Sequence, residues 1–246
     1  IGPVYWQTGN SDLALQVGLA AAFVGGLVEI LGGFAGRFIV ETIPNSALMG
    51  NMASSAMVWL SIVGLAMVFD KPVYAVLPLF IIIIDYLGKA DKRFAKIPSG
   101  VIAILIGTAV AWACGYLTPG ALRDSFSEIG FYPPSLGIGD IAAGFKGIVP
   151  YLPVIIPLQI NNFLSTLQGL ESAKMAGDVY PERRSMIMDG VSTMTGALFG
   201  NPFPTTVYFG HPGWKDLDAR AGFSLVNGGL CLFICTTGLT GVLMAL

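Results

Sequence analysis

Long apolar runs separated by short polar links dominate the sequence. A helix needs about 20 mainly apolar residues to cross the hydrocarbon core of a bilayer, and several of these runs approach or reach that length. The pattern predicts about seven membrane segments, at residues 13–34, 46–69, 73–87, 99–117, 148–173, 185–199 and 221–246. We therefore expect an all-α polytopic membrane protein.

Charged residues are concentrated in the links, and their distribution predicts the orientation of the chain in the membrane. The densest basic cluster, from Lys89 to Lys96, and a second basic link, from Lys174 to Arg184, are separated by two crossings. Because Lys and Arg accumulate in cytoplasmic loops, both links are predicted to be cytoplasmic. The long polar stretch 118–147 is then expected on the opposite side, with a short surface helix.

Composition supports a membrane location. Of 246 residues, 54% are hydrophobic and only 11% are charged, against about a quarter charged in soluble domains; the mean hydropathy is +0.72. We expect a multi-pass protein of the plasma or inner membrane, surrounded by lipid. The net charge of −2 argues against a nucleic-acid partner. Cys114, Cys231 and Cys235 lie in apolar runs and are expected to be small buried hydrophobes.

The apolar pattern is interrupted most strongly between residues 158 and 215. The run from Gly200 to Pro204 excludes a continuing helix, and Thr205 to Tyr208 favour extended backbone. Gly210 to Gly213 then allow at most a short half-helix. Lipid offers no hydrogen-bond partners to irregular backbone. This broken segment, near 202–213, must therefore be buried in protein or line a cavity.

Two polar stripes flank the broken segment. One predicted helix aligns Asn161, Ser165, Gln168 and Ser172 on one face, and the next aligns Asp189, Ser192, Thr193, Gly196 and Gly200. Taken alone, such stripes are more often helix-packing faces, although the midplane site of a secondary transporter shows the same pattern. His211, the only histidine, is expected either to contact a ligand or relay protons, or to cap the broken segment. Glu29, inside the first apolar run, is expected either to face neighbouring helices or to lie near the interface.

The sequence from Asp189 to Thr193, then Gly196 to Gly200, then Pro204 to Tyr208 resembles the ninth and tenth helices of the nucleobase–cation symporter-2 family, the nucleobase/ascorbate and AzgA-like purine permeases. Residues 161–177 resemble the eighth helix of that family, and 13–117 its fourth to seventh. The specific part of the resemblance is 189–213; elsewhere the hydropathy is compatible.

The resemblance implies a fold of fourteen spans in two inverted seven-helix repeats, divided into core and gate domains. In that fold the third and tenth spans each contain a short strand and a half-helix, with substrate between them. Residues 1–246 would form a single membrane domain, a fragment of that fold. Residues 13–117 would supply four spans of the first repeat and 148–246 spans of the second, with one broken segment near 202–213. Because the sequence begins at Ile1, it looks truncated or processed.

The sequence departs from the family at two acidic positions that bind the base. Asn161 or Asn162, or Leu164 in another register, replaces the acid of the eighth helix, and Phe209, Gly210 and His211 stand where the second acid is expected. An amide can still pair with a base edge as donor and acceptor. His211, Asp189 and Glu171 are the substitutes for proton coupling, although Asp189 and Glu171 are expected to have structural roles near the cytoplasmic interface. The predicted substrate-binding residues are Asn161, Asn162, Ser165, Gln168, Tyr208, Phe209, Gly210 and His211.

The sequence therefore predicts a permease for a purine, a pyrimidine or a similar small heterocycle, working by alternating access. Coupling to H⁺ or Na⁺ and a homodimer are compatible with it, and no cofactor or metal is expected. One alternative is an anion carrier of the sulfate-permease type, which shares the architecture; another is a non-transporting homologue. The sequence carries no HExxH, GxSxG or carboxylate-pair motif, so an enzyme is not predicted.

Overall fold

The structure, a computed structural model, describes residues 1–88, 99–216 and 218–245. The described chain divides into two compact units. Unit 1 contains residues 1–53 and 134–223, and unit 2 contains residues 54–133 and 224–246. Each unit thus combines segments from both halves of the sequence. The predicted basic cluster from Lys89 to Lys96 lies outside the described residues.

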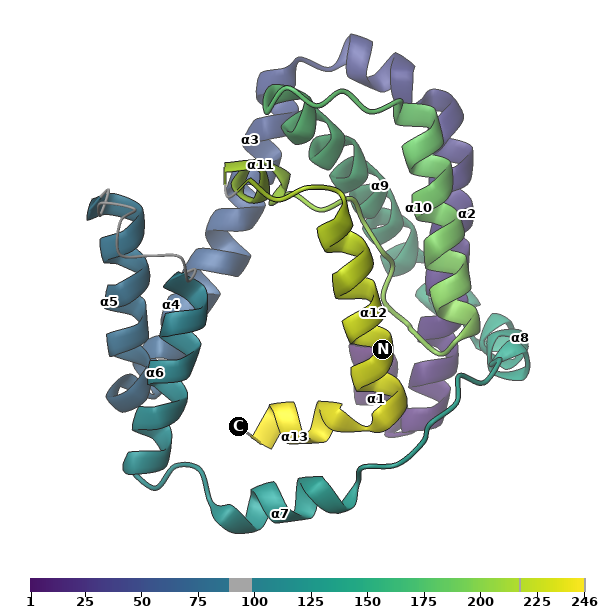
Figure 1. The fold of residues 1–246 in the computed structure, drawn as a ribbon. Helices are drawn as coiled ribbons and strands as arrows, with labels where there is room; N and C mark the ends of the chain where they lie inside the picture. The colour runs from purple at the N-terminus through teal and green to yellow at the C-terminus, as the bar shows by residue number, and fades with distance from the viewer. Residues whose placement is uncertain (89–98, 217, 246) are drawn as a thin grey trace. The chain divides into compact units, whose positions relative to one another are not determined.

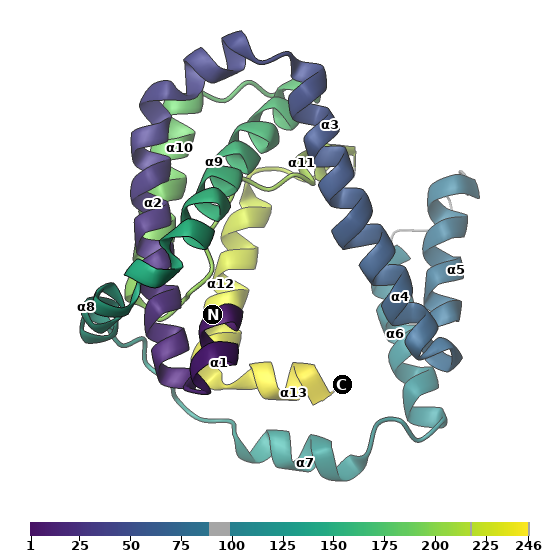
Figure 2. The same cartoon turned by 180° about the vertical axis from the view of Figure 1, so that it is seen from behind.

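Unit 1 is built around three helices, shown in Figure 1 and from behind in Figure 2. They are α2 (Ser11–Thr42), α9 (Leu152–Met175) and α10 (Glu182–Leu198). The shorter elements of this unit are α1 (Gly2–Thr8), α8 (Ile138–Gly147), the 3₁₀ turn η3 (Val149–Tyr151) and α11 (His211–Asp216); α3 (Asn45–Ala56) begins in it.

Unit 2 holds the second group of apolar helices. A π-helical turn, η1 (Met57–Ile62), continues α3 into α4 (Val63–Asp70), so the second predicted span is one continuous helical run. The other helices of this unit are α5 (Pro72–Gly88), α6 (Ser99–Ala113), α7 (Pro119–Ser127), most of α12 (Gly222–Thr237) and α13 (Leu239–Ala245). Helix α7 is the short helix expected within 118–147.

All regular secondary structure in the described residues is helical, as the sequence predicts. By length and composition, two helical runs are able to cross a membrane, Ser11–Thr42 and Ser46–Asp70. Two further pairs qualify if each bent pair is one span, Ile138–Gly147 with Val149–Met175 and Gly222–Thr237 with Leu239–Ala245. The described chain therefore holds two to four candidate spans.

Two breaks have local causes. The fifth predicted span begins irregularly, as its prolines predict: α8 and the run from η3 into α9 meet at a 67° bend beside Pro150. The last span, predicted as one helix, is instead broken between α12 and α13 with a 96° bend. Gly238 lies at this break with φ 71°, a left-handed conformation that favours glycine and ends a helix.

Glycines allow α2 to approach both of its neighbours. Gly32 of α2 lies against the Phe163 ring of α9, where an added Cβ would meet ring carbons at 2.2 Å. On the α10 side, Gly26 and Gly190 face each other, each with its Cβ position 2.5 Å from the carbonyl oxygen of the other. Small residues let membrane helices pack at close range. This packing makes α2 the centre of unit 1.

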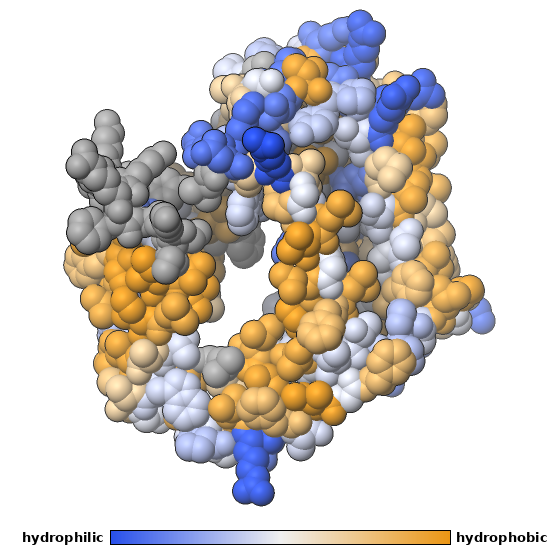
Figure 3. All heavy atoms as spheres, in the orientation of Figure 1, coloured by the Kyte–Doolittle hydropathy of each residue, from blue (hydrophilic) through white to orange (hydrophobic). Residues whose placement is uncertain are grey.

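The surface carries many large apolar side chains. Figure 3 shows apolar residues over the sides of α5 and α12. Among them Phe80 and Ile84 of α5 are 55% and 59% exposed, and Leu225 of α12 is 82% exposed. Such surfaces suit a hydrocarbon environment, because extended apolar patches are rare on soluble monomers. The three cysteines share this surface: all are free and exposed, so the expectation that they are buried is wrong.

The short strand expected near 202–213 is not formed in the described residues. Residues 201–208 are extended and non-helical, and α11 follows as the expected half-helix. A strand requires a backbone ladder with a second extended segment. Here side chains of α9 and α10 provide hydrogen bonds to the extended backbone instead, and these contacts form the candidate site.

Candidate functional site

The broken segment runs between α9 and α10, and side chains of these helices satisfy its backbone. The amide of Thr205 donates to Thr193 Oγ1 at 2.9 Å, and the Thr205 carbonyl accepts from Asn162 Nδ2 at 3.2 Å. Farther along, the Phe209 carbonyl accepts from Ser172 Oγ at 3.5 Å. Irregular backbone in a membrane needs such partners. None of residues 201–210 is buried, and Phe203 and Tyr208 are 67% and 59% exposed, so these contacts tie the segment to both helices but do not enclose it in protein as predicted.

The face of α9 that meets the segment differs from the predicted stripe. The contacts run from Asn162 through Thr166 and Gly169 to Ser172. Ten helical residues rise about 15 Å, and four extended residues, from Thr205 to Phe209, span about 13 Å. The segment therefore lies along α9 in the same direction. The contact stripe is displaced by one residue from Asn161, Ser165 and Gln168, about 100° around the helix, and shares only Ser172 with the predicted one.

Two buried carboxylates lie beside this segment. Glu29 of α2 is fully buried and Asp189 of α10 is 9% exposed. Asp189 accepts from Thr166 Oγ1 at 2.6 Å and from Thr205 Oγ1 at 2.9 Å. Glu29 accepts from Asn162 Nδ2 and, at 3.4 Å, from Thr193 Oγ1. Since Thr193 and Thr205 are joined by a 2.8 Å hydrogen bond, the two carboxylates belong to one hydroxyl network.

The partners of both carboxylates in the described part of the chain are threonine and asparagine side chains. None of these partners is a cation, and buried charges are normally paired or bind ions. Among the described residues no group of three or more His, Cys, Asp or Glu side chains is placed to hold a metal ion.

A cavity of about 410 Å³ adjoins this network within unit 1. Small-molecule sites usually measure about 300–1,000 Å³, with apolar walls and a few polar groups. Most of this wall is apolar, and its polar side chains come from α9 together with one tyrosine before it: Gln159, Asn161, Asn162 and Tyr151. The remaining lining residues are Ile1, Gly2, Pro3, Val4, Val17, Gly18, Ala21, Ala22, Val154, Ile155, Leu158, Pro202, Phe203 and Pro204.

Asn162 connects the cavity to the carboxylates. Its side chain lines the cavity and donates through Nδ2 to Glu29 and to the Thr205 carbonyl. Both acceptors are oxygens, so the amide nitrogen must face them and the orientation of the amide is fixed. A ligand that moves Asn162 would thereby disturb the hydrogen bond to Glu29.

Of the predicted site residues, only Asn161 and Asn162 line this cavity. Ser165 donates to the Asn161 carbonyl, and Gln168 is buried within unit 1. Tyr208 is 59% exposed and its ring lies over Gly210. Contact of these residues, and of Phe209 and His211, with a ligand stays a prediction.

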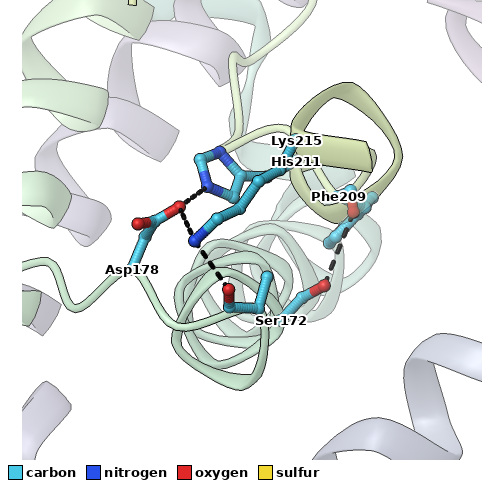
Figure 4. Close-up of polar contacts among 6 residues, drawn as sticks. Ser172, Asp178, Phe209, His211 and Lys215 are labelled. Carbon is cyan, nitrogen blue, oxygen red and sulfur yellow. Dashed lines mark hydrogen bonds and ion pairs between the residues drawn. The ribbon is translucent and has the colours of Figure 1, made fainter. Parts of the chain in front are cut away.

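His211 takes part in a separate polar cluster beyond the C-terminal end of α9. Its Nε2 lies 2.7 Å from Asp178 Oδ2, and Lys215 Nζ lies 2.9 Å from the same oxygen (Figure 4). The hydrogen bond from His211 and then that from Lys215 lower the pKa of Asp178, so this carboxylate is ionised near neutral pH. Lys215 also donates to the Ala176 carbonyl at 2.7 Å. The cluster holds α11 against the end of α9, and the capping of the broken segment by His211 stays a prediction.

Glu29 and Gln159 are the residues that the sequence interpretation missed. Two positions were expected for Glu29, and the one in which this residue faces neighbouring helices is correct. Asp189, expected near an interface, is buried in the network, whereas Glu171 pairs with Lys174 at 3.1 Å. A signal was available: Gly25 and Gly26 precede Glu29 by one turn, which predicts close neighbours around the carboxylate. Gln159 was not among the residues that helical spacing aligned in the predicted polar stripe of α9.

Comparisons with protein-family models, curated proteins and solved structures find no match to this chain.

Proposed function

We propose that the protein is a secondary transporter, a permease for a purine or pyrimidine nucleobase or a similar small heterocycle, working by alternating access. The observation that carries the proposal is the apolar cavity with an amide-bearing face next to a broken segment and two buried carboxylates. Secondary transporters bind substrate and coupling ion beside discontinuous helices.

The lining suits a flat heterocycle. Tyr151 and Phe203 offer rings against which a planar base can stack, and Asn161 and Asn162 offer amide groups for its edge. An anion carrier is less well supported, since no Lys or Arg belongs to this lining. A buried carboxylate one hydrogen bond away also disfavours an anionic substrate.

The arrangement of the chain supports the inverted-repeat fold of the permeases that it resembles. Unit 1 takes residues 1–53 from the first part of the chain and 134–223 from the second, and unit 2 does the same with 54–133 and 224–246. Core and gate domains that each draw helices from both repeats have this pattern. In this proposal unit 1 is the substrate-binding core and unit 2 belongs to the gate.

The coupled ion, H⁺ or Na⁺, would bind at the network of Glu29 and Asp189. Both carboxylates are buried, and threonine hydroxyls join them. One bound cation would offset one of the two negative charges, and its presence would be transmitted to the cavity through Asn162. This assignment replaces His211 and Glu171, which have their own partners.

The test is uptake by the protein reconstituted in proteoliposomes. We expect saturable uptake of at least one of xanthine, uracil, adenine and guanine, and no flux of sulfate or bicarbonate. Asn161→Leu, at an exposed position on the cavity wall, should weaken substrate binding about tenfold, because one ligand hydrogen bond is lost. Asn162→Leu should abolish uptake.

Thr195→Ala is the control, since Thr195 is exposed on α10 and bonds to its own helix. It should transport like the wild type. Uptake of sulfate without any nucleobase would overturn the proposed substrate. Unchanged nucleobase uptake in both asparagine variants would overturn the site.

A further inference from the structure

Gln159 is a buried polar side chain outside the network of Glu29 and Asp189. It is 6% exposed, lines the cavity, and donates through Nε2 to the Ala21 carbonyl at 3.2 Å. In the described structure its Oε1 is buried against Gly25 with no hydrogen-bond partner. An unsatisfied buried acceptor costs about 1–3 kcal/mol, and most buried side-chain polar atoms do have a partner.

The amide nitrogens of Gln159 and Asn162, on this face of α9, already donate hydrogen bonds. Nε2 of Gln159 points to a carbonyl, and Nδ2 of Asn162 points to a carboxylate and a carbonyl. Because all of these partners are acceptors, neither amide can be flipped without placing oxygen against oxygen. These contacts therefore leave Asn162 Oδ1 and Gln159 Oε1 without a role, and Gln159 Oε1 is buried against Gly25. They lie three residues apart, so they are neighbours on one helix face.

We propose that Gln159 is a specificity-determining residue, and that Gln159 Oε1 and Asn162 Oδ1 form an acceptor pair that receives N–H donors from an amino-substituted heterocycle. On binding, Gln159 Oε1 turns from Gly25 toward the cavity by a partial rotation of the terminal amide, short of the flip that would place it against the Ala21 carbonyl, and the 3.2 Å bond from Nε2 to that carbonyl is lost. An exocyclic amino group, which has two N–H donors, satisfies both oxygens. A ring edge that offers only acceptors leaves them unpaired. This inference rests on the proposed function and names the substrate class of the same cavity.

The test compares ligands that differ by one amino group. Binding of adenine and purine, and of cytosine and pyrimidin-2-one, is measured with the purified protein in detergent. For at least one pair the wild type should prefer the amino compound by about tenfold, the value of one or two hydrogen bonds. In Gln159→Met, which keeps the length of the side chain, the preference should fall to about twofold.

The preference ratio separates recognition from folding. A structural role of Gln159 would weaken both members of a pair equally, whereas recognition changes only the amino compound. The melting temperature of ligand-free Gln159→Met should equal or exceed that of the wild type, since an unsatisfied oxygen is removed. If nucleobases bind but Gln159→Met keeps the wild-type ratio, or if the wild type prefers the compounds without the amino group, this inference fails alone. If no heterocycle binds the wild type, the proposed function fails as well.

Discussion

At the scale of single residues, the most informative contrast is between two buried glutamates. Glu29 and Glu171 are 0% and 2% exposed. Glu171 lies 3.1 Å from Lys174 Nζ, so its charge is offset within its own helix. Glu29 has only Asn162 and Thr193 as partners in the described chain. A carboxylate buried without a cation is typical of ion-binding and proton-relay sites in membranes.

Glu29→Gln should separate binding from coupling. The amide oxygen of Gln can accept the hydrogen bond from Asn162, while the change removes the group that takes up a proton or a cation. Proteoliposomes with an imposed H⁺ or Na⁺ gradient should accumulate nucleobase in the wild type. In Glu29→Gln the substrate should only equilibrate across the membrane, with exchange of internal for external substrate retained. Substrate accumulation is the measurement.

The matched control is Glu171→Gln, an equal change of charge at a glutamate that has a cationic partner. It should accumulate substrate like the wild type. Gradient-driven accumulation by Glu29→Gln at the wild-type level would show that the coupling ion binds elsewhere.

At the scale of elements, the glycines of α2 determine which helices meet. Gly25 and Gly32 lie against α9, and Gly26 and Gly33 lie against α10. Each pair is separated by seven residues, so each marks one face of the helix. Glu29 lies between the first and the second glycine of each pair. Side chains of both α9 and α10 therefore reach it.

Gly190→Ala tests this close approach. The new Cβ would lie 2.5 Å from the Gly26 carbonyl oxygen and 2.7 Å from a side-chain carbon of Ile30, so the helices must separate. Overpacking of this kind destabilises by about 1–3 kcal/mol. The melting temperature in detergent should fall, and uptake with it.

Gly64→Ala in α4 is the control, and its expected effect on stability has the opposite sign. No atom lies within 4 Å of its Cβ position, and Ala is favoured over Gly within a helix by about 0.5–1 kcal/mol. This variant should therefore be as stable as the wild type or more stable. A Gly190→Ala protein that melts at or above the wild-type temperature would contradict the close crossing of α2 and α10.

Elements were more predictable from the sequence than the contacts between them. The apolar runs gave the helices, and the prolines predicted the irregular start before α9, because both features act within a few residues. The sequence interpretation placed the polar stripe of α9 on Asn161 and Ser165, one residue away from the face that makes the contacts. That face depends on Thr205 and Thr206. Those residues are about forty positions distant in sequence, and spacing along a single helix carries no information about them.

At the scale of the whole molecule, the candidate spans and the basic links together predict which segments lie on each side of the membrane. The two to four candidate spans include, if the bent pair is one span, the run from α8 into α9, which in the sequence separates the polar stretch that contains α7 from the basic link 174–184. The positive-inside rule then predicts that this link is cytoplasmic and that α7 lies on the other side of the membrane. The two parts of this run meet at a 67° bend, and α9 contributes 24 residues to it.

Single cysteines on the two sides of this run test the topology. Cys114, Cys231 and Cys235 are first replaced by Ser, and cysteine is then introduced at Ser127, the last residue of α7, or at Val179, which is 74% exposed. A membrane-impermeant maleimide applied to intact cells should label the cysteine of Ser127→Cys, because this residue faces outward. The cysteine of Val179→Cys should react only after the membrane is permeabilised, since the basic link is inside. Reversed labelling would overturn the orientation, and labelling of both positions in intact cells would show that α8 and α9 do not cross the bilayer between them.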